Sequence, residues 1–213
     1  MLPKLTGLYL ENLYLNFMML ILASITPQSY CLTLNPSELI TQNRLVNWDT
    51  EVVDIEDVHR LLSRYSIHKL ILSDGTLDWA TGRDLRKFLR AVPNLKALIM
   101  NFYTLDNKLF KVLEPPSATR NIPFPQLETL EFRGSTVPGD ITRLKKLVTK
   151  HPLQRLVLGQ RTFPDGSHEL DINLTENAGA VKWLKATVPG FLFIPHDIDP
   201  PECTDVVWLL WDI

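Results

Sequence analysis

The sequence predicts an α/β fold, an irregular leucine-rich-repeat solenoid with parallel strands on one face and helices on the other. Three observations predict it. A short leucine-spaced motif recurs along the chain, amphipathic helical segments separate its copies, and prolines stand just before several of them. Each copy is too small to bury its own apolar side chains, so we expect neighbouring copies to stack into a continuous core.

The repeated motif has apolar residues at its first, fourth and sixth places and another at the eleventh. Seven copies start at Leu5, Ser29, Ile67, Leu95, Leu127, Leu153 and Val188. The intervals between starts are 24, 38, 28, 32, 26 and 35 residues, whereas regular leucine-rich repeats run to about 20 to 29. The eleventh place is apolar in every copy, which favours a true repeat with variable linkers over chance alternation.

Apolar residues at helical spacing predict a helix in most of the linkers. A side-chain oxygen at the start of a helix accepts a hydrogen bond from a free backbone N–H, which marks the expected first residues. The expected helices run over Asp54–Tyr65 and begin near Thr81, Asp106, Asp140 and Thr175. Proline disfavours helix at and just before its own position, so Pro93, Pro125 and Pro152 favour extended chain before the next strand.

The most apolar stretch, Leu13–Ile25, is 13 residues long. A membrane-spanning helix needs about 20 apolar residues, and Glu11 stands just before this stretch, which weakens a signal-peptide interpretation. We therefore expect a buried helix of the core. Because the stacking is continuous, the sequence predicts one leucine-rich-repeat domain over residues 1–213, with the weakest repeat pattern at 14–66 and 164–213.

The composition narrows the classes of partner. With 22 basic and 24 acidic residues the formal net charge is −2, so we expect neither nucleic acid nor a membrane as a partner. The two cysteines, Cys31 and Cys203, provide no disulfide framework and no zinc site, which predicts a reducing compartment, cytoplasmic or nuclear.

No enzymatic motif was found, and we expect neither catalysis nor a cofactor. None of the five histidines stands in an HExxH pattern, and no GxSxG motif or glycine-rich phosphate loop occurs. The segment from His196 to Cys203 contains side chains that can bind metals, but their spacing matches no ligand frame. We interpret it as a solvated loop and predict no metal site.

Two segments carry a resemblance to a known family. Residues 124–132 (FPQLETLEF) and 92–100 (VPNLKALIM) resemble the repeats of fungal F-box proteins. The resemblance implies a protein-binding scaffold, the substrate-receptor part of an F-box-like ubiquitin-ligase subunit. No F-box is recognisable before Leu5, so the alternative is a stand-alone repeat protein without a ubiquitin role. We expect the first repeat to pack against a further N-terminal domain or partner, since repeat arrays need capped ends.

The candidate binding surface is the strand face that points away from the helices. Side chains alternate along a strand, so the residues between the core leucines point outward. The candidate partner-binding residues are Tyr9, Lys69, Ile71, Ile99, Asn101, Glu131, Arg133, Arg155 and Val157. An apolar centre with an arginine-bearing rim suits protein recognition. The alternative is that Ile71 and Ile99 merely reflect the preference of strands for β-branched residues.

Overall fold

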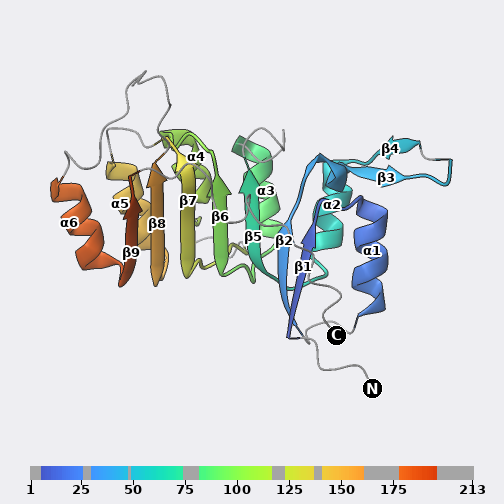
Figure 1. Cartoon of the computed structure of the whole chain (residues 1–213), viewed down its shortest axis with the longest axis horizontal. Helices are drawn as coiled ribbons and strands as arrows, with labels where there is room; N and C mark the ends of the chain where they lie inside the picture. The colour runs from blue at the N-terminus through green and yellow to red at the C-terminus, as the bar shows by residue number, and fades with distance from the viewer. Residues whose placement is uncertain are drawn as a thin grey trace.

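The computed structural model describes residues 6–25, 30–47, 49–73, 82–116, 123–136, 141–160 and 178–195. They form a mixed α/β structure around a seven-stranded sheet in which every pairing is parallel (Figure 1). In spatial order the strands are β1 (Gly7–Glu11), β2 (Cys31–Asn35), β5 (Ile67–Ser73), β6 (Ala97–Asn101), β7 (Thr129–Ser135), β8 (Arg155–Gln160) and β9 (Gly190–Ile194). Within this sheet the spatial order is the order in the sequence, so each strand pairs with the next strand of the same sheet.

Helices connect these strands. They are α1 (Leu15–Ser24), α2 (Ile55–Leu62), α3 (Gly82–Ala91), α4 (Asn107–Leu113), α5 (Thr142–Lys150) and α6 (Ala178–Thr187). Figure 1 shows α2 to α5 behind the sheet, with α1 and α6 at its two ends. The predicted α/β class with a sheet of parallel strands is confirmed.

Two apolar ladders join the sheet to the helices. The first consists of Leu10, Leu34, Leu70, Leu98, Leu130, Leu156 and Phe191, in register from β1 to β9. The second consists of Leu72, Met100, Phe132, Leu158 and Phe193. These side chains share one core cluster with helix residues such as Phe88 and Phe110, both fully buried. The leucines of the repeated motif therefore build the interface between sheet and helices.

The predicted helix starts agree with the structure where it describes them. Asp54 Oδ1 accepts the Glu56 N–H at 2.9 Å, and Asp106 Oδ1 accepts the Leu109 N–H at 2.7 Å. Helix α5 begins one residue after Ile141. Thr81, Asp140 and Thr175, which were predicted to begin helices, lie outside the described residues, as does the segment from His196 to Cys203.

The segment between β2 and β5 contains structure that the repeat pattern does not predict. A short 3-10 helix, η1 (Glu38–Thr41), leads into an antiparallel hairpin of β3 (Gln42–Arg44) and β4 (Thr50–Val52). The hairpin extends away from the sheet in Figure 1. It accounts for the longest interval of the repeat, 38 residues, and contacts α1 through β3.

Helix α1 corrects one expectation. The apolar stretch does form a helix, but only one side of it is buried, at Leu15, Met18 and Leu22. Phe17 and Leu20 are 44% and 66% exposed. Since α1 is the first helix of the row, its outer side has no preceding described helix to pack against. Apolar composition alone could not reveal this one-sided burial.

Candidate functional site

The nine candidate residues lie on the sheet face opposite the leucine ladders, where they form transverse rows across the strands. The first row is in register from β1 to β9: Tyr9, Thr33, Lys69, Ala97, Thr129, Arg155 and Gly190. Every member of this row is at least partly exposed, and Tyr9 is 42% exposed. Three candidates, Tyr9, Lys69 and Arg155, therefore share one accessible row.

The remaining six candidates differ from the expectation of an exposed patch. Ile71, Ile99 and Val157 are 1%, 2% and 0% exposed, and the neighbouring Asn101, Glu131 and Arg133 are also buried. Alternation along a strand determines which face a side chain points to, but it does not determine whether that face is open to solvent. The expected apolar centre of the binding surface is therefore inaccessible, and of the nine candidates only the three in the first row can meet a partner directly.

Glu131 connects the buried part of this face to the accessible row. Its carboxylate accepts hydrogen bonds from Arg133 Nε at 3.0 Å on its own strand and from Arg155 Nε at 2.8 Å on the next. Two positive charges thus compensate a carboxylate whose side chain is only 9% exposed. Buried charges are tolerated when paired in this way. The cluster holds the Arg155 side chain, which is 47% exposed, at the edge of the open row.

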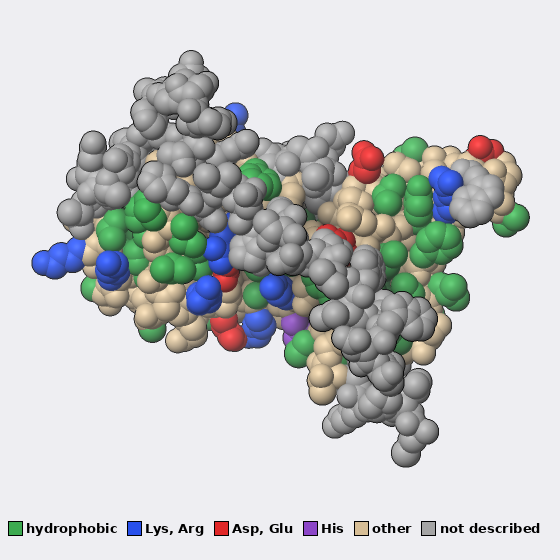
Figure 2. Space-filling model, viewed as in Figure 1, with side chains coloured by type: hydrophobic (Ala, Val, Ile, Leu, Met, Phe, Trp, Pro, Cys, Tyr) green, Lys and Arg blue, Asp and Glu red, His purple; other side chains and the backbone are tan. Residues whose placement is uncertain are grey.

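A second accessible row adjoins the first at the amino ends of the strands. We define the amino-edge band as both rows together, with the main accessible side chains Tyr9, Cys31, His68, Lys69, Lys96, Glu128 and Arg155. Lys96 Nζ and Glu128 Oε1 form an ion pair of 2.8 Å between neighbouring strands. Figure 2 shows basic and acidic side chains and a histidine gathered along the lower edge of the sheet. The band is a polar strip of mixed charge.

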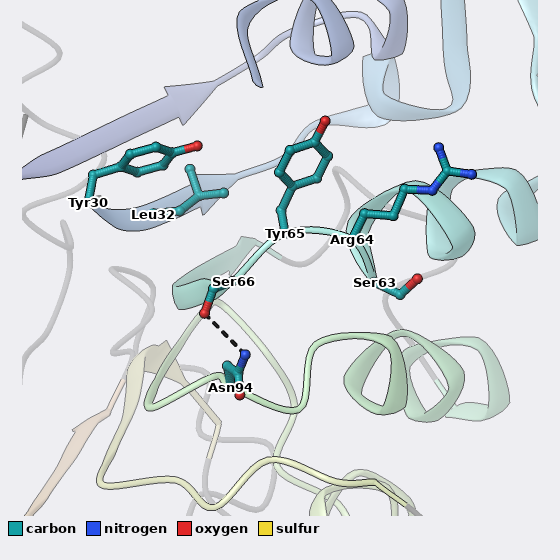
Figure 3. A pocket seen from close by; sticks show the side chains of 7 residues that line it. All are labelled: Tyr30, Leu32, Ser63, Arg64, Tyr65, Ser66 and Asn94. Atoms are coloured by element: carbon teal, nitrogen blue, oxygen red, sulfur yellow. Dashed lines mark hydrogen bonds between the residues drawn. The ribbon is translucent and has the colours of Figure 1, made fainter. Parts of the chain in front are cut away.

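The band contains a groove near β2, β5 and β6. Its volume is about 680 Å³, and its lining residues are Thr6, Tyr30, Cys31, Ser66, His68, Asn94 and Lys96. A smaller pocket of about 170 Å³ adjoins it and shares Tyr30, Ser66 and Asn94. Figure 3 shows the Tyr30 and Tyr65 rings rising from neighbouring segments of this pocket. Burial raises the pKa of Tyr30, with a further contribution from Tyr65, so its hydroxyl stays protonated at neutral pH.

A hydrogen-bond chain fixes the floor of the groove. His68 Nδ1 accepts the backbone N–H of Leu32 at 3.3 Å, so the ring proton is on Nε2 when the ring is neutral. That nitrogen lies 3.4 Å from Ser66 Oγ, which also accepts from Asn94 Nδ2 at 3.1 Å (Figure 3). These hydrogen bonds link residues at or just before the first residues of three neighbouring strands, β2, β5 and β6. The hydrogen-bond chain presents a polar surface, on which the histidine ring meets a serine hydroxyl at a distance close to the limit of hydrogen bonding.

Other kinds of site are not found in the part of the chain that the structure describes. No group of three His, Cys, Asp or Glu side chains there is arranged to hold a metal ion. Among the same residues no helix has the length and apolar character needed to cross a bilayer.

Sequence reasoning missed the second row of the band. Alternation predicts a direction only where single residues separate the apolar places of the motif, as between the fourth and sixth places. Two residues separate the first and fourth places, so the rule gives His68 and Lys96 no clear direction. The signal that could have found them is the position itself: both directly follow the first apolar place of the motif, at or just before the start of a strand. Turn residues on the rim of a sheet are commonly accessible.

Comparisons with known proteins give no relative. No family model matches the chain, and neither a curated protein nor a solved structure is similar to it.

Proposed function

We propose that the chain is a leucine-rich-repeat solenoid that binds a protein through the amino-edge band. The observation that carries the proposal is the continuous accessible row across seven parallel strands, which adjoins a groove at β2, β5 and β6. Such a strip offers hydrogen-bonding and charged groups of both signs together with Tyr9 as an aromatic contact. Tyrosine and arginine are the residue types most enriched at the centres of protein interfaces.

Several features support binding rather than small-molecule chemistry. The groove is wide and open to solvent, whereas small-molecule pockets enclose most of their ligand. Its side chains are tied to one another by His68, Ser66 and Asn94 hydrogen bonds instead of pointing at a common reacting position. A pre-arranged polar surface reduces the entropy lost when a partner binds.

A finer proposal concerns the biological role. The likeness of residues 92–100 and 124–132 to fungal F-box repeats supports a substrate-receptor part of a ubiquitin-ligase subunit. In that role a bound partner is degraded faster when the chain is present. We therefore expect the half-life of the partner to lengthen in cells that lack the chain. An unchanged half-life contradicts the receptor role and supports a stand-alone interaction protein.

Binding itself is tested by comparing two double variants of equal charge change. Lys69→Glu/Lys96→Glu alters the band, and Arg90→Glu/Lys108→Glu alters the outer side of the helices. Proteins bound to the tagged chain are quantified by mass spectrometry for each variant and for the wild type. We expect at least one bound protein to fall about tenfold with the band variant, since about 1.4 kcal/mol is lost, and to persist with the helix variant. The same set of proteins for all three chains contradicts the proposal.

A further inference from the structure

Four of the helices, α3 to α6, contain many more basic than acidic residues. Helices α3, α4, α5 and α6 contain four, two, four and two basic residues, and the one acidic residue within their bounds is Asp84. Their apolar residues, such as Leu85, Phe88 and Leu144, are buried against the sheet. The positive charge of these four helices therefore lies on the outer side of the helix layer, although the whole chain has a formal net charge of −2.

We define the basic helix face as the exposed cations of three helices that pack in sequence, α3, α4 and α5. Its residues are Arg83, Arg90, Lys108, Lys111, Lys146 and Lys150. Each is exposed, so the ammonium and guanidinium groups can meet a partner without rearrangement of the core.

The chain already holds one carboxylate among these cations. Glu114 follows α4, and its Oε2 lies 2.8 Å from Lys150 Nζ and 3.5 Å from Lys146 Nζ. Its Oε1 lies 3.8 Å from Arg143 Nη1. Burial is the largest single influence on this group and opposes ionisation, yet the Lys150 and Lys146 contacts together outweigh it and lower the pKa. Three cations share this one carboxylate, so positive charge remains in excess around it.

We propose that the basic helix face binds an acidic, extended protein segment by its carboxylates. Packed helices lie about 8–10 Å apart, and an extended chain in the polyproline II conformation rises about 3.1 Å per residue and repeats every three residues, so that every third side chain is on one side. A carboxylate at every third residue can therefore meet α3, α4 and α5 in turn. Glu114 is the intramolecular example of the contact that each carboxylate would make.

An acidic segment fits better than an anionic membrane because the positive surface stops at α3. The next helix in the layer, α2, has Glu56 and Asp57 in its first turn and Asp54 as its cap. Lys87 of α3 is occupied by Glu56 at 2.5 Å. A flat bilayer against the helix layer would bring these acidic groups to the lipid headgroups, whereas a narrow segment along α3 to α5 avoids them.

A single-stranded nucleic acid is disfavoured by the aromatic residues. Proteins that bind single strands combine cations with aromatic side chains on which bases stack. The aromatic residues of α3 and α4, Phe88 and Phe110, are fully buried. Trp183 of α6 is half-buried, and Lys145 Nζ lies over its ring at 5.4 Å from the centroid. The basic helix face thus offers charges without a stacking surface.

The test uses a fluorescein-labelled peptide with glutamate at every third position in a Gly-Ser background, and the same peptide with glutamine. Fluorescence anisotropy with the full chain is expected to show binding of the glutamate peptide that weakens as salt is added. Arg90→Glu/Lys108→Glu should weaken binding at least about tenfold, and Lys69→Glu/Lys96→Glu, with the same charge change on the opposite side, by less than about twofold. Neither altered pair contacts Glu114.

Three results overturn the proposal: equal binding of the two peptides, equal losses in the two double variants, or tighter binding of other probes than of the glutamate peptide. The other probes are single-stranded and duplex DNA oligonucleotides and phosphatidylcholine vesicles that contain phosphatidylserine. Circular dichroism checks that each variant is folded. If Arg90→Glu/Lys108→Glu does not fold, Arg90→Gln/Lys108→Gln is measured in its place, and a loss under about twofold then overturns the proposal. Because the band variant is the control, this result is independent of the proposed function.

Discussion

At the scale of single residues, two buried histidines make the fold sensitive to acid. His151 is 5% exposed; its Nδ1 accepts the Leu127 N–H at 3.3 Å, and its Nε2–H donates to the Leu113 carbonyl at 3.0 Å. A neutral ring satisfies both bonds, and burial lowers the pKa of His151 from its usual 6.5. His59, edge-on to Phe88 at 5.9 Å, has its pKa lowered by the same cause.

We therefore expect the free energy of unfolding to fall as the pH falls below about 6.5. The unfolded chain binds the His151 proton more strongly than the folded protein does, so protons are taken up on unfolding, and the stabilisation is complete only above that pH. Urea unfolding of wild type and His151→Gln at about pH 7.5 and 5.5 checks this. Glutamine keeps an acceptor and a donor without titrating, so the loss between the two pH values should shrink by up to about 1 kcal/mol.

The matched control is Thr149→Ala, an exposed change on the same turn, which should leave the pH dependence as in the wild type. A His151→Gln protein with the full wild-type loss would show that this ring does not titrate on unfolding.

At the scale of elements, the helices and sheet strands were largely predictable, whereas the hairpin of β3 and β4 was not. Leucine spacing identified all seven strands of the sheet, and Asp54 and Asp106 marked two helix starts, because these signals are local. The hairpin strands are three residues each and half-buried or exposed, so they leave no periodic apolar pattern.

The candidate site was predicted less well. Exposure of Ile71 and Ile99 depends on what packs over the strand face, which the pattern within a strand does not contain.

Helix α1 provides the prediction at this scale, because its sequence is apolar on all sides and only the structure distinguishes them. Leu20→Asp is expected to change the free energy of unfolding by no more than about 0.5 kcal/mol, since Leu20 is 66% exposed. Met18→Asp should destabilise by at least about 3 kcal/mol, because Met18 is 1% exposed and a carboxylate there loses its hydration. Thermal and urea unfolding measure both variants. Similar losses at the two positions would mean that α1 is rotated relative to the arrangement described.

At the scale of the whole molecule, stability is expected to depend on position along the row of strands. Leu98 lies in the middle of the first ladder, fully buried between Leu70 and Leu130. Leu8 lies in β1, where its partner in the pairing is Leu32 of β2, and it is only partly buried.

Leu98→Ala should therefore lower the free energy of unfolding by about 2–5 kcal/mol, the cost of a cavity that its neighbours cannot fill. Leu8→Ala should lower it by less than about 2 kcal/mol, since a half-buried side chain loses less contact. Urea unfolding monitored by circular dichroism compares the two. Equal losses at Leu8 and Leu98 would contradict a sheet whose centre is better packed than its end.

The order of the strands in space, which repeats their order along the chain, has a consequence for how such a protein changes over generations. A strand with its helix that is inserted or deleted between two others changes only the contacts of its immediate neighbours, and the more distant strand pairings are unchanged. The β3–β4 hairpin shows a milder form of the same freedom, since β2 and β5 still pair in parallel on either side of this long linker, with one register shift at Leu32 and Thr33. Gene duplication can therefore lengthen this architecture stepwise, because each added strand and helix packs only on the one before it.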